Sequence, residues 1–292
     1  LSLFAVPYVG WMSIFVVAPI IIMVVYAFST AAGDFTLENF ARMGTYTAVF
    51  TRSFKLAIIA TLIALLIGYP VSYMLSKEGP QVQRIAMVLI MLPMWMNFLL
   101  RTYSWMSILE NNGLLNQLFQ QIGLIDLYNQ VAMHFAADPA AYVPIDHFQM
   151  IGTQGAVVLG MVYNYLPFMI LPIYSVLVKL DRSLVEAAAD LGANPITCFI
   201  KVVLPQSVPG IISGITMVFI PAITTFAISR LLGGGKFLLY GDLIENQFIT
   251  LGQSAWPVGS ALSFILLILV LLSMAVMRRA ERDSGDEGGM LW

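Results

Sequence analysis

The sequence contains few charged residues. Asp, Glu, Lys and Arg make up only 10% of its 292 residues, whereas a soluble domain carries about 25%. Hydrophobic residues make up 59%, and the mean hydropathy is +0.86. So few charges cannot cover the surface of a water-soluble protein of this size. The formal net charge of −2 also excludes the broad basic surface that binds nucleic acid.

Residues that bind metals or catalyse reactions are also scarce. Cys198 is the only cysteine, so no intrachain disulfide can form. His134, Asp138, Asp146 and His147 match no common metal-site spacing. The stretch 233–236 is similar to the end of a phosphate-binding loop, but it lacks the earlier glycine and the Ser or Thr that should follow the lysine. The sequence therefore indicates no resident metal, ATP site or enzyme centre.

Long apolar runs are present instead, and a bilayer requires about 20 such residues per helix. The sequence predicts six membrane spans, near Phe4–Phe28, Phe54–Leu75, Ile85–Leu109, Val157–Val178, Val208–Leu231 and Val258–Met277. The expected fold is an all-α integral membrane protein with one permease domain, residues 1–278. Residues 279–292 are expected to form a disordered tail. The outer connection includes a segment with helical spacing, residues 114–122, which is expected at the membrane surface.

A polar segment, Lys179–Lys201, separates two of these spans. Ser183 and Glu186 have the spacing of a capping box, which predicts a helix from Leu184. Gly192 can adopt the positive φ that ends a helix. Asn194 and Pro195 are typical of the N-cap and first residue of a second short helix, to about Val203. The segment is therefore expected to be a helix-turn-helix.

This segment resembles the EAA loop of bacterial ABC importer permeases. The matching residues are Glu186, Ala187, Ala188, Asp190, Gly192, Leu204 and Pro205, and Val202 replaces the usual isoleucine. The resemblance implies that residues 179–205 form a cytoplasmic coupling loop that docks on an ATPase subunit. With this segment inside, eight Lys and Arg residues are cytoplasmic and six are outside. This is the bias expected from the positive-inside rule. Both termini are then cytoplasmic.

Two apolar stretches, 92–97 and 163–168, combine aromatic rings, an amide and a proline. The proline is expected to break the helix in each stretch. In lipid a broken helix is tolerated where helices pack or line a wet cavity. They predict a solute pathway lined by Trp95, Asn97, Tyr103, Tyr163, Asn164, Tyr165 and Phe168. Three acids near the outer ends of spans are expected at its mouth, where they would attract cations: Glu110, Asp242 and Glu245.

The resemblance covers nearly the whole chain, except a longer stretch at 129–155. The stretches 92–103, 166–174, 232–234 and 256–257 are similar to the spermidine/putrescine group of these permeases, to their B-type subunit or its putrescine-only counterpart. The resemblance implies ATP-driven polyamine import across the bacterial plasma membrane. The implied partners are a C-type permease subunit, two ATPase subunits that hold ATP and Mg²⁺, and an extracytoplasmic polyamine-binding protein. This chain itself would hold no cofactor.

Two alternatives remain open at this stage. A permease of the same family could carry iron(III), sulfate or molybdate, although an anion favours arginines facing the pore. An ion-coupled secondary transporter fits the composition as well, but it usually needs an acidic residue deep in a span. None of the six predicted spans contains one.

Overall fold

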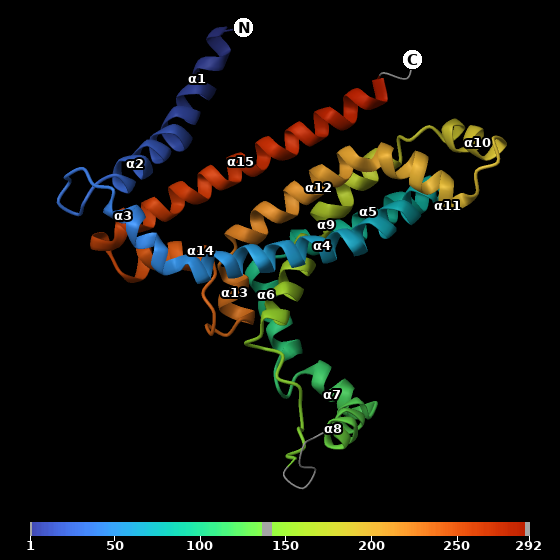
Figure 1. The fold of residues 1–292 in the computed structure, drawn as a ribbon, viewed down its shortest axis with the longest axis horizontal. Coiled ribbons are helices and arrows are strands. Elements are labelled where there is room, and N and C mark those ends of the chain that lie inside the picture. Colours follow the sequence, from blue (N-terminus) through green and yellow to red (C-terminus); the bar gives the residue numbers. More distant parts are fainter. Residues whose placement is uncertain (1, 136–141, 290–292) are drawn as a thin grey trace.

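The computed structural model describes residues 2–135 and 142–289, and almost all of them are helical (Figure 1). The only extended pairing in these residues is an isolated bridge between Ser29 and Phe35. The α-helices, in chain order, are α1 (Ser2–Met12), α2 (Ala18–Ala27), α3 (Glu38–Ala41), α4 (Thr47–Lys77), α5 (Pro80–Trp95), α6 (Phe98–Leu109), α7 (Leu114–Gln121), α8 (Leu124–Phe135), α9 (Gln154–Leu177), α10 (Arg182–Asp190), α11 (Pro195–Cys198), α12 (Leu204–Thr224), α13 (Ala227–Leu232), α14 (Tyr240–Glu245) and α15 (Trp256–Gly289).

Five helical stretches in the described residues are long and apolar enough to cross a membrane, or six when α5 and α6–α7 count as one bent span. These stretches are Val6–Ala27, Glu38–Lys77, Gln154–Leu177, Pro195–Thr224 and Gln253–Arg279. The predicted all-α membrane fold is therefore confirmed. The tight turn at residues 78 and 79, between α4 and α5, also lies between two predicted spans.

Helices α4, α9 and α12 form the centre of the molecule, and small residues let them approach closely. Met169 of α9 is completely buried between two glycines. A Cβ added at Gly68 of α4 would lie 2.9 Å from Met169 Cγ, and one added at Gly214 of α12 would lie 2.8 Å from Met169 Sδ. Ser72 Oγ also donates a hydrogen bond to the Ile170 carbonyl at 3.1 Å, which ties α4 to α9. One long side chain thus fills the space that two missing side chains leave.

Two of the predicted spans are broken. The axis turns by 92° between α5 and α6. Asn97 stands at this break, and its Oδ1 accepts hydrogen bonds from Leu99 N at 2.8 Å and Leu100 N at 3.3 Å. The predicted span Val208–Leu231 is likewise divided, because α12 ends at Thr224 and α13 begins at Ala227. The helix break that the sequence predicts in the stretch 92–97 is confirmed, whereas α9 runs without a break through the stretch 163–168, where the second was predicted.

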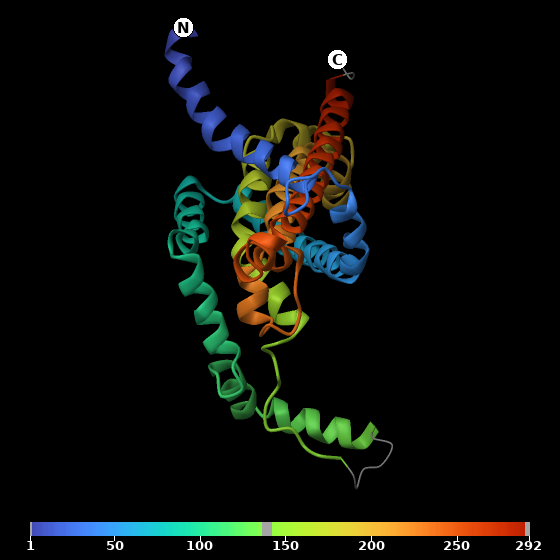
Figure 2. The same cartoon turned by 90° about the vertical axis from the view of Figure 1, so that its left-hand side faces the viewer.

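The chain ends also differ from expectation in one respect. Helix α2 packs beside α15, and the two chain ends lie at the same side of the molecule (Figures 1 and 2). Helix α15 continues to Gly289, so the prediction of a disordered tail is wrong for residues 279–289. Residues 290–292 lie outside the described part.

Helices α7 and α8 project away from the bundle, as Figure 2 shows most clearly. The helix expected around residues 114–122 is present as α7. Two asparagines hold the following chain against this pair. Asn116 Nδ2 donates to the Phe148 carbonyl at 3.0 Å, and its Oδ1 accepts from Phe148 N at 2.9 Å. Asn129 Nδ2 likewise donates to the Ile145 carbonyl at 2.8 Å, and its Oδ1 accepts from Ile145 N at 3.0 Å. The longer stretch noted in the sequence is thus fastened by side-chain amides.

The close approach at Met169 leads to a first prediction. Gly214→Ala should lower the free energy of unfolding by about 1–3 kcal/mol, because its methyl group overpacks the core. In Gly10→Ala, the matched control, the added methyl meets no atom within 4 Å. Thermal unfolding in detergent should show a lower Tm for the first variant alone. Equal Tm values for the two variants would contradict the packing described.

Candidate functional site

The α10–α11 segment lies at one end of the molecule, far from α7 and α8 (Figure 1). Helix α10 begins two residues earlier than the capping-box spacing suggests. Its N-cap is Asp181, whose Oδ1 accepts a hydrogen bond from Ser183 N at 2.9 Å. Ser183 therefore lies inside the helix, and the predicted capping box with Glu186 is wrong. Hydrogen bonds from the backbone and side chain of Ser183 hold the pKa of Asp181 below its ordinary value.

The turn after α10 is a Schellman motif. Gly192 N donates to the Ala189 carbonyl at 2.9 Å, and Ala193 N donates to the Ala188 carbonyl at 3.0 Å. Gly192 has a φ of +85°, which side-chain-bearing residues rarely adopt. The predicted role of this glycine is confirmed. The turn requires a glycine here for conformation rather than for space, since an added Cβ would meet no atom within 4 Å.

The second short helix is capped as the sequence predicts. Asn194 Oδ1 accepts a hydrogen bond from Thr197 N at 2.8 Å, and Pro195 is the first residue of α11. The chain then passes through a π-helical turn, Phe199–Val203, directly into α12. Helix α11 is therefore continuous with the membrane span Pro195–Thr224.

The face of the α10–α11 segment that points away from the bundle carries exposed apolar side chains. Leu191 is 90% exposed and Ile196 is 71% exposed. Glu186, Ala187, Asp190 and Pro205 are exposed too, whereas Ala188 and Leu204 are half-buried. Two bulky apolar side chains beside acidic residues form a surface that suits docking to another protein.

The inner face is anchored to the bundle by aromatic rings. Phe199 packs edge-on against Tyr69 and Tyr73 of α4, with ring centroids 5.8 and 5.2 Å apart. Val185 of α10 packs on the cluster that contains Val203 and Met169. The segment is therefore packed directly against the centre of the bundle.

The predicted pathway residues lie in several different environments. Trp95 and Tyr103 are on the surface, at 77% and 46% exposed. Tyr165 is half-buried and donates a hydrogen bond to the Pro221 carbonyl of α12 at 3.3 Å. Phe168 packs on the cluster around Met169. Asn97 caps α6, as described above.

Tyr163 and Asn164 lie closer to the bundle interior. The Tyr163 ring packs edge-on against Trp105, with centroids 5.2 Å apart. Asn164 is 2% exposed, and its Nδ2 donates to the Gly160 carbonyl at 2.8 Å. Its Oδ1 has no hydrogen-bond partner in the described residues.

Arg101, which the sequence analysis counted among the six basic residues on the outer side, is buried in the protein. Its side chain is 8% exposed, and one Nη donates to the Pro93 carbonyl at 2.6 Å. In the sequence, the only indication of this burial is that a single arginine lies within a long apolar run.

The three predicted mouth acids also differ from one another. Asp242 is 2% exposed, and its Oδ2 accepts hydrogen bonds from Ser229 Oγ at 2.5 Å and Leu239 N at 2.9 Å. Burial raises its pKa, while these hydrogen bonds act in the opposite direction. Glu245 forms an ion pair with Arg230. Asp242 is therefore too buried to attract cations at a mouth, and Glu245 is already paired with Arg230.

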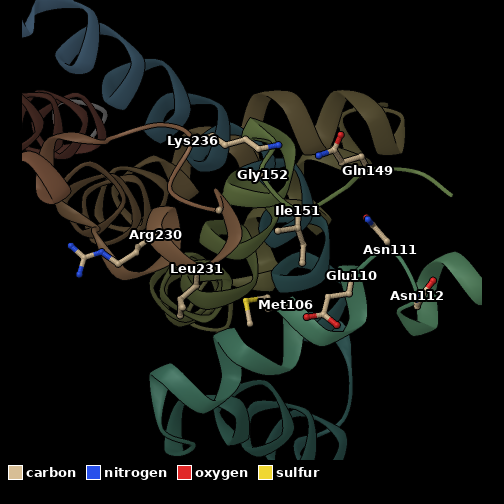
Figure 3. A pocket seen from close by; sticks show the side chains of 11 residues that line it. Met106, Glu110, Asn111, Asn112, Gln149, Ile151, Gly152, Arg230, Leu231 and Lys236 are labelled. Atoms are coloured by element: carbon tan, nitrogen blue, oxygen red, sulfur yellow. The ribbon is translucent and has the colours of Figure 1, made fainter.

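Glu110 remains as an exposed acid on a cavity. The cavity has a volume of about 680 Å³ and lies between the end of α6, the start of α9 and the loop after α13 (Figure 3). In Figure 3, Glu110 and Lys236 stand on different sides of it. Its other lining side chains include amides and Arg230. The cavity is therefore lined by side chains of both charges, by amides and by apolar groups.

The chain is similar to known transport proteins along most of its length. Residues 64–284 match the family model described as "Binding-protein-dependent transport system inner membrane component". The spermidine/putrescine transport system permease protein PotB of Haemophilus influenzae is 37% identical over 281 residues, covering 94% of this chain and 91% of that protein. The protein of the same name from Escherichia coli K12 is 36% identical, covering 94% and 95%.

Solved structures agree on the fold. A bacterial ABC transporter involved in the import of the acidic polysaccharide alginate matches with a TM-score of 0.69 at 17% identity, covering 95% of both chains. The MetNI methionine ABC transporter matches with a TM-score of 0.58 at 19% identity, covering 84% of this chain and 98% of that one. The chain therefore belongs to the family of binding-protein-dependent transport system inner membrane components, the permease subunits of ABC transporters.

Proposed function

We propose that the chain is one permease subunit of an ATP-driven importer of polyamines such as spermidine and putrescine. The observation that carries this proposal is the 36–37% identity, over 94% of the chain, to permeases named for spermidine/putrescine transport. The proposal extends to a bacterial plasma membrane location and to transport by alternating access.

The proposal includes three kinds of partner. A second, C-type permease subunit would complete the pore. Two ATPase subunits would hold ATP and Mg²⁺ and dock on the α10–α11 segment, where Leu191 and Ile196 are exposed. An extracytoplasmic binding protein would deliver the polyamine on the opposite side. The chain itself would bind no cofactor, and ATP would be hydrolysed only by the partners.

The proposed assembly implies an orientation of the chain in the membrane. The α10–α11 segment and both chain ends would face the cytoplasm, whereas α7, α8 and the cavity beside Glu110 would face outward. Residues 1–278 would act as one membrane domain, with residues 279–292 as a cytoplasmic tail.

A polyamine pathway must attract ammonium groups without trapping them. Aromatic faces do this, at roughly 0.5–2 kcal/mol for each cation–π contact. Trp95, Tyr103 and Tyr163 offer such faces. The exposed surfaces of Trp95 and Tyr103 would become pathway walls once the second permease is present. Glu110 would provide the attracting carboxylate at the outer cavity.

One observation favours a second candidate, an anionic solute. Arg101 is a buried cation, and the described residues place no carboxylate in ion-pair contact with it. An anion would gain from such a charge. The uptake experiment below therefore includes sulfate and molybdate beside the polyamines.

The cargo is tested by uptake into proteoliposomes that contain the purified complex with its ATPase. Spermidine and putrescine should accumulate only with ATP, and sulfate and molybdate should not. Trp95→Ala should slow polyamine uptake several-fold with little change in Tm, because the ring is 77% exposed. Phe35→Ala is the matched control, since its ring is 78% exposed and lies outside the predicted pathway. Wild-type uptake by Trp95→Ala, or ATP-driven uptake of an anion alone, would refute the assignment.

Coupling is tested at the turn after α10. Gly192→Val should cost about 1–3 kcal/mol in local strain, because valine resists the φ of +85°. It should uncouple ATP hydrolysis from uptake. Gly79→Val is the control, since Gly79 joins two helices with a φ of −68° and free space around it. Glu186→Ala should also reduce substrate-stimulated ATP hydrolysis, although Glu186 makes no capping bond. Normal coupling in both Gly192→Val and Glu186→Ala would exclude the segment from the mechanism.

Orientation is tested with single cysteines. The native Cys198 is 6% exposed and is first replaced by alanine. Ala189→Cys on α10 should then react with a membrane-impermeant maleimide only from the cytoplasmic side. Leu114→Cys on α7, 69% exposed, should react only from the outside. The reverse pattern would overturn the orientation and the coupling role together.

A further inference from the structure

Arg101 lies where the break between α5 and α6 meets α9. Besides the hydrogen bond that it donates to the Pro93 carbonyl at 2.6 Å, its guanidinium carbon lies 5.9 Å from the centroid of the Tyr163 ring. No carboxylate of the described residues forms an ion pair with it. A cation is thus held within an apolar span by a carbonyl oxygen and a ring face, without a counter-charge.

Arg101 and the residue that follows Tyr163 each carry an unsatisfied polar atom. Among the described residues, the buried side-chain nitrogen and oxygen atoms without a hydrogen bond are Arg101 Nε and Asn164 Oδ1. Asn164 follows Tyr163 directly. Its Nδ2 is engaged by the Gly160 carbonyl at 2.8 Å, which leaves the oxygen as the free acceptor. Leaving a buried acceptor unpaired is costly, and a ligand that brings N–H groups would satisfy it.

Carbonyl oxygens and aromatic faces are also the groups that bind organic ammonium ions. We propose that Arg101 occupies, in the substrate-free protein, a binding site for one ammonium group of the substrate. The Pro93 carbonyl, the Tyr163 ring and the Asn164 amide oxygen form this site. The inference rests on the proposed function, because it takes a cationic amine as the cargo.

Arg101 is then an internal competitor of the substrate. The site is open only in the fraction of molecules whose guanidinium has moved away. The apparent Kd therefore equals the Kd of the open site divided by that fraction. Entry of an ammonium group would also release Arg101 from Pro93, on the far side of the 92° bend. Arrival of substrate and the angle between α5 and α6 are therefore linked.

The test is the Kd of radiolabelled spermidine for the purified complex without its binding protein. Arg101→Gln should lower this Kd by about three-fold or more, because the competing cation is gone. Arg101→Lys keeps a cation and should stay close to the wild type. Arg52→Gln is the matched control, because Arg52 also lies 5.7 Å from a ring centroid, that of Phe237, but far from the break in sequence. It should leave the Kd unchanged.

A second variant covers the case in which Arg101→Gln does not assemble. Asn164→Leu keeps the branched shape of the side chain but replaces both amide atoms with methyl groups, so the acceptor is lost and the Kd should rise by about three-fold or more. The two variants thus move the Kd in opposite directions, whereas a purely structural role would move both the same way. An unchanged or higher Kd in Arg101→Gln, an unchanged Kd in Asn164→Leu, or no detectable binding in any form contradicts the inference.

These outcomes are separable from the proposed function. If wild-type proteoliposomes accumulate no polyamine with ATP, the proposed function fails. If they do accumulate it and Arg101→Gln does not bind spermidine more tightly, only the assignment of Arg101 fails.

Discussion

Hydrocarbon offers no partner to a backbone N–H or C=O group, and the arrangement of this chain follows from that constraint. A helix can break inside a span only where side chains replace the lost hydrogen bonds. At the bend between α5 and α6 such replacements are found on both sides. Asn97 Oδ1 caps the first amides of α6, and Arg101 donates to the Pro93 carbonyl at the end of α5. The polar groups that a pathway needs are therefore the same groups that make the bend possible.

A second set of contacts joins this region to the exposed end of the molecule. Phe199 stands between the α10–α11 segment and the tyrosines of α4, and α4 shares Met169 with α9 and α12 through two glycines. Close packing of this kind leaves little room for independent movement. A force applied at Leu191 would thus reach α9, which carries Tyr163 and Asn164, through side chains in direct contact.

The parts of this account that the sequence predicted are those with local causes. Gly192 and Asn194 act through their own backbone and their nearest neighbours, so their roles are readable from spacing. Ser183 was misjudged because Asp181, two residues earlier, competes for the same cap. The burial of Arg101 and Asp242 depends on groups from other turns and helices, such as Pro93 and Ser229. Composition alone placed both outside the core, and no local pattern indicates otherwise.

The central claim is that the α10–α11 segment is the contact between this permease and an ATPase. It is tested most directly by a photoreactive amino acid placed at Leu191, which is 90% exposed, in native membranes. Illumination should join the chain to an ATP-binding subunit, and ATP should alter the yield. The same probe at Leu118 of α7, which is 49% exposed, should not capture that subunit. Capture of the ATPase from Leu118, or its absence from Leu191, would contradict the account.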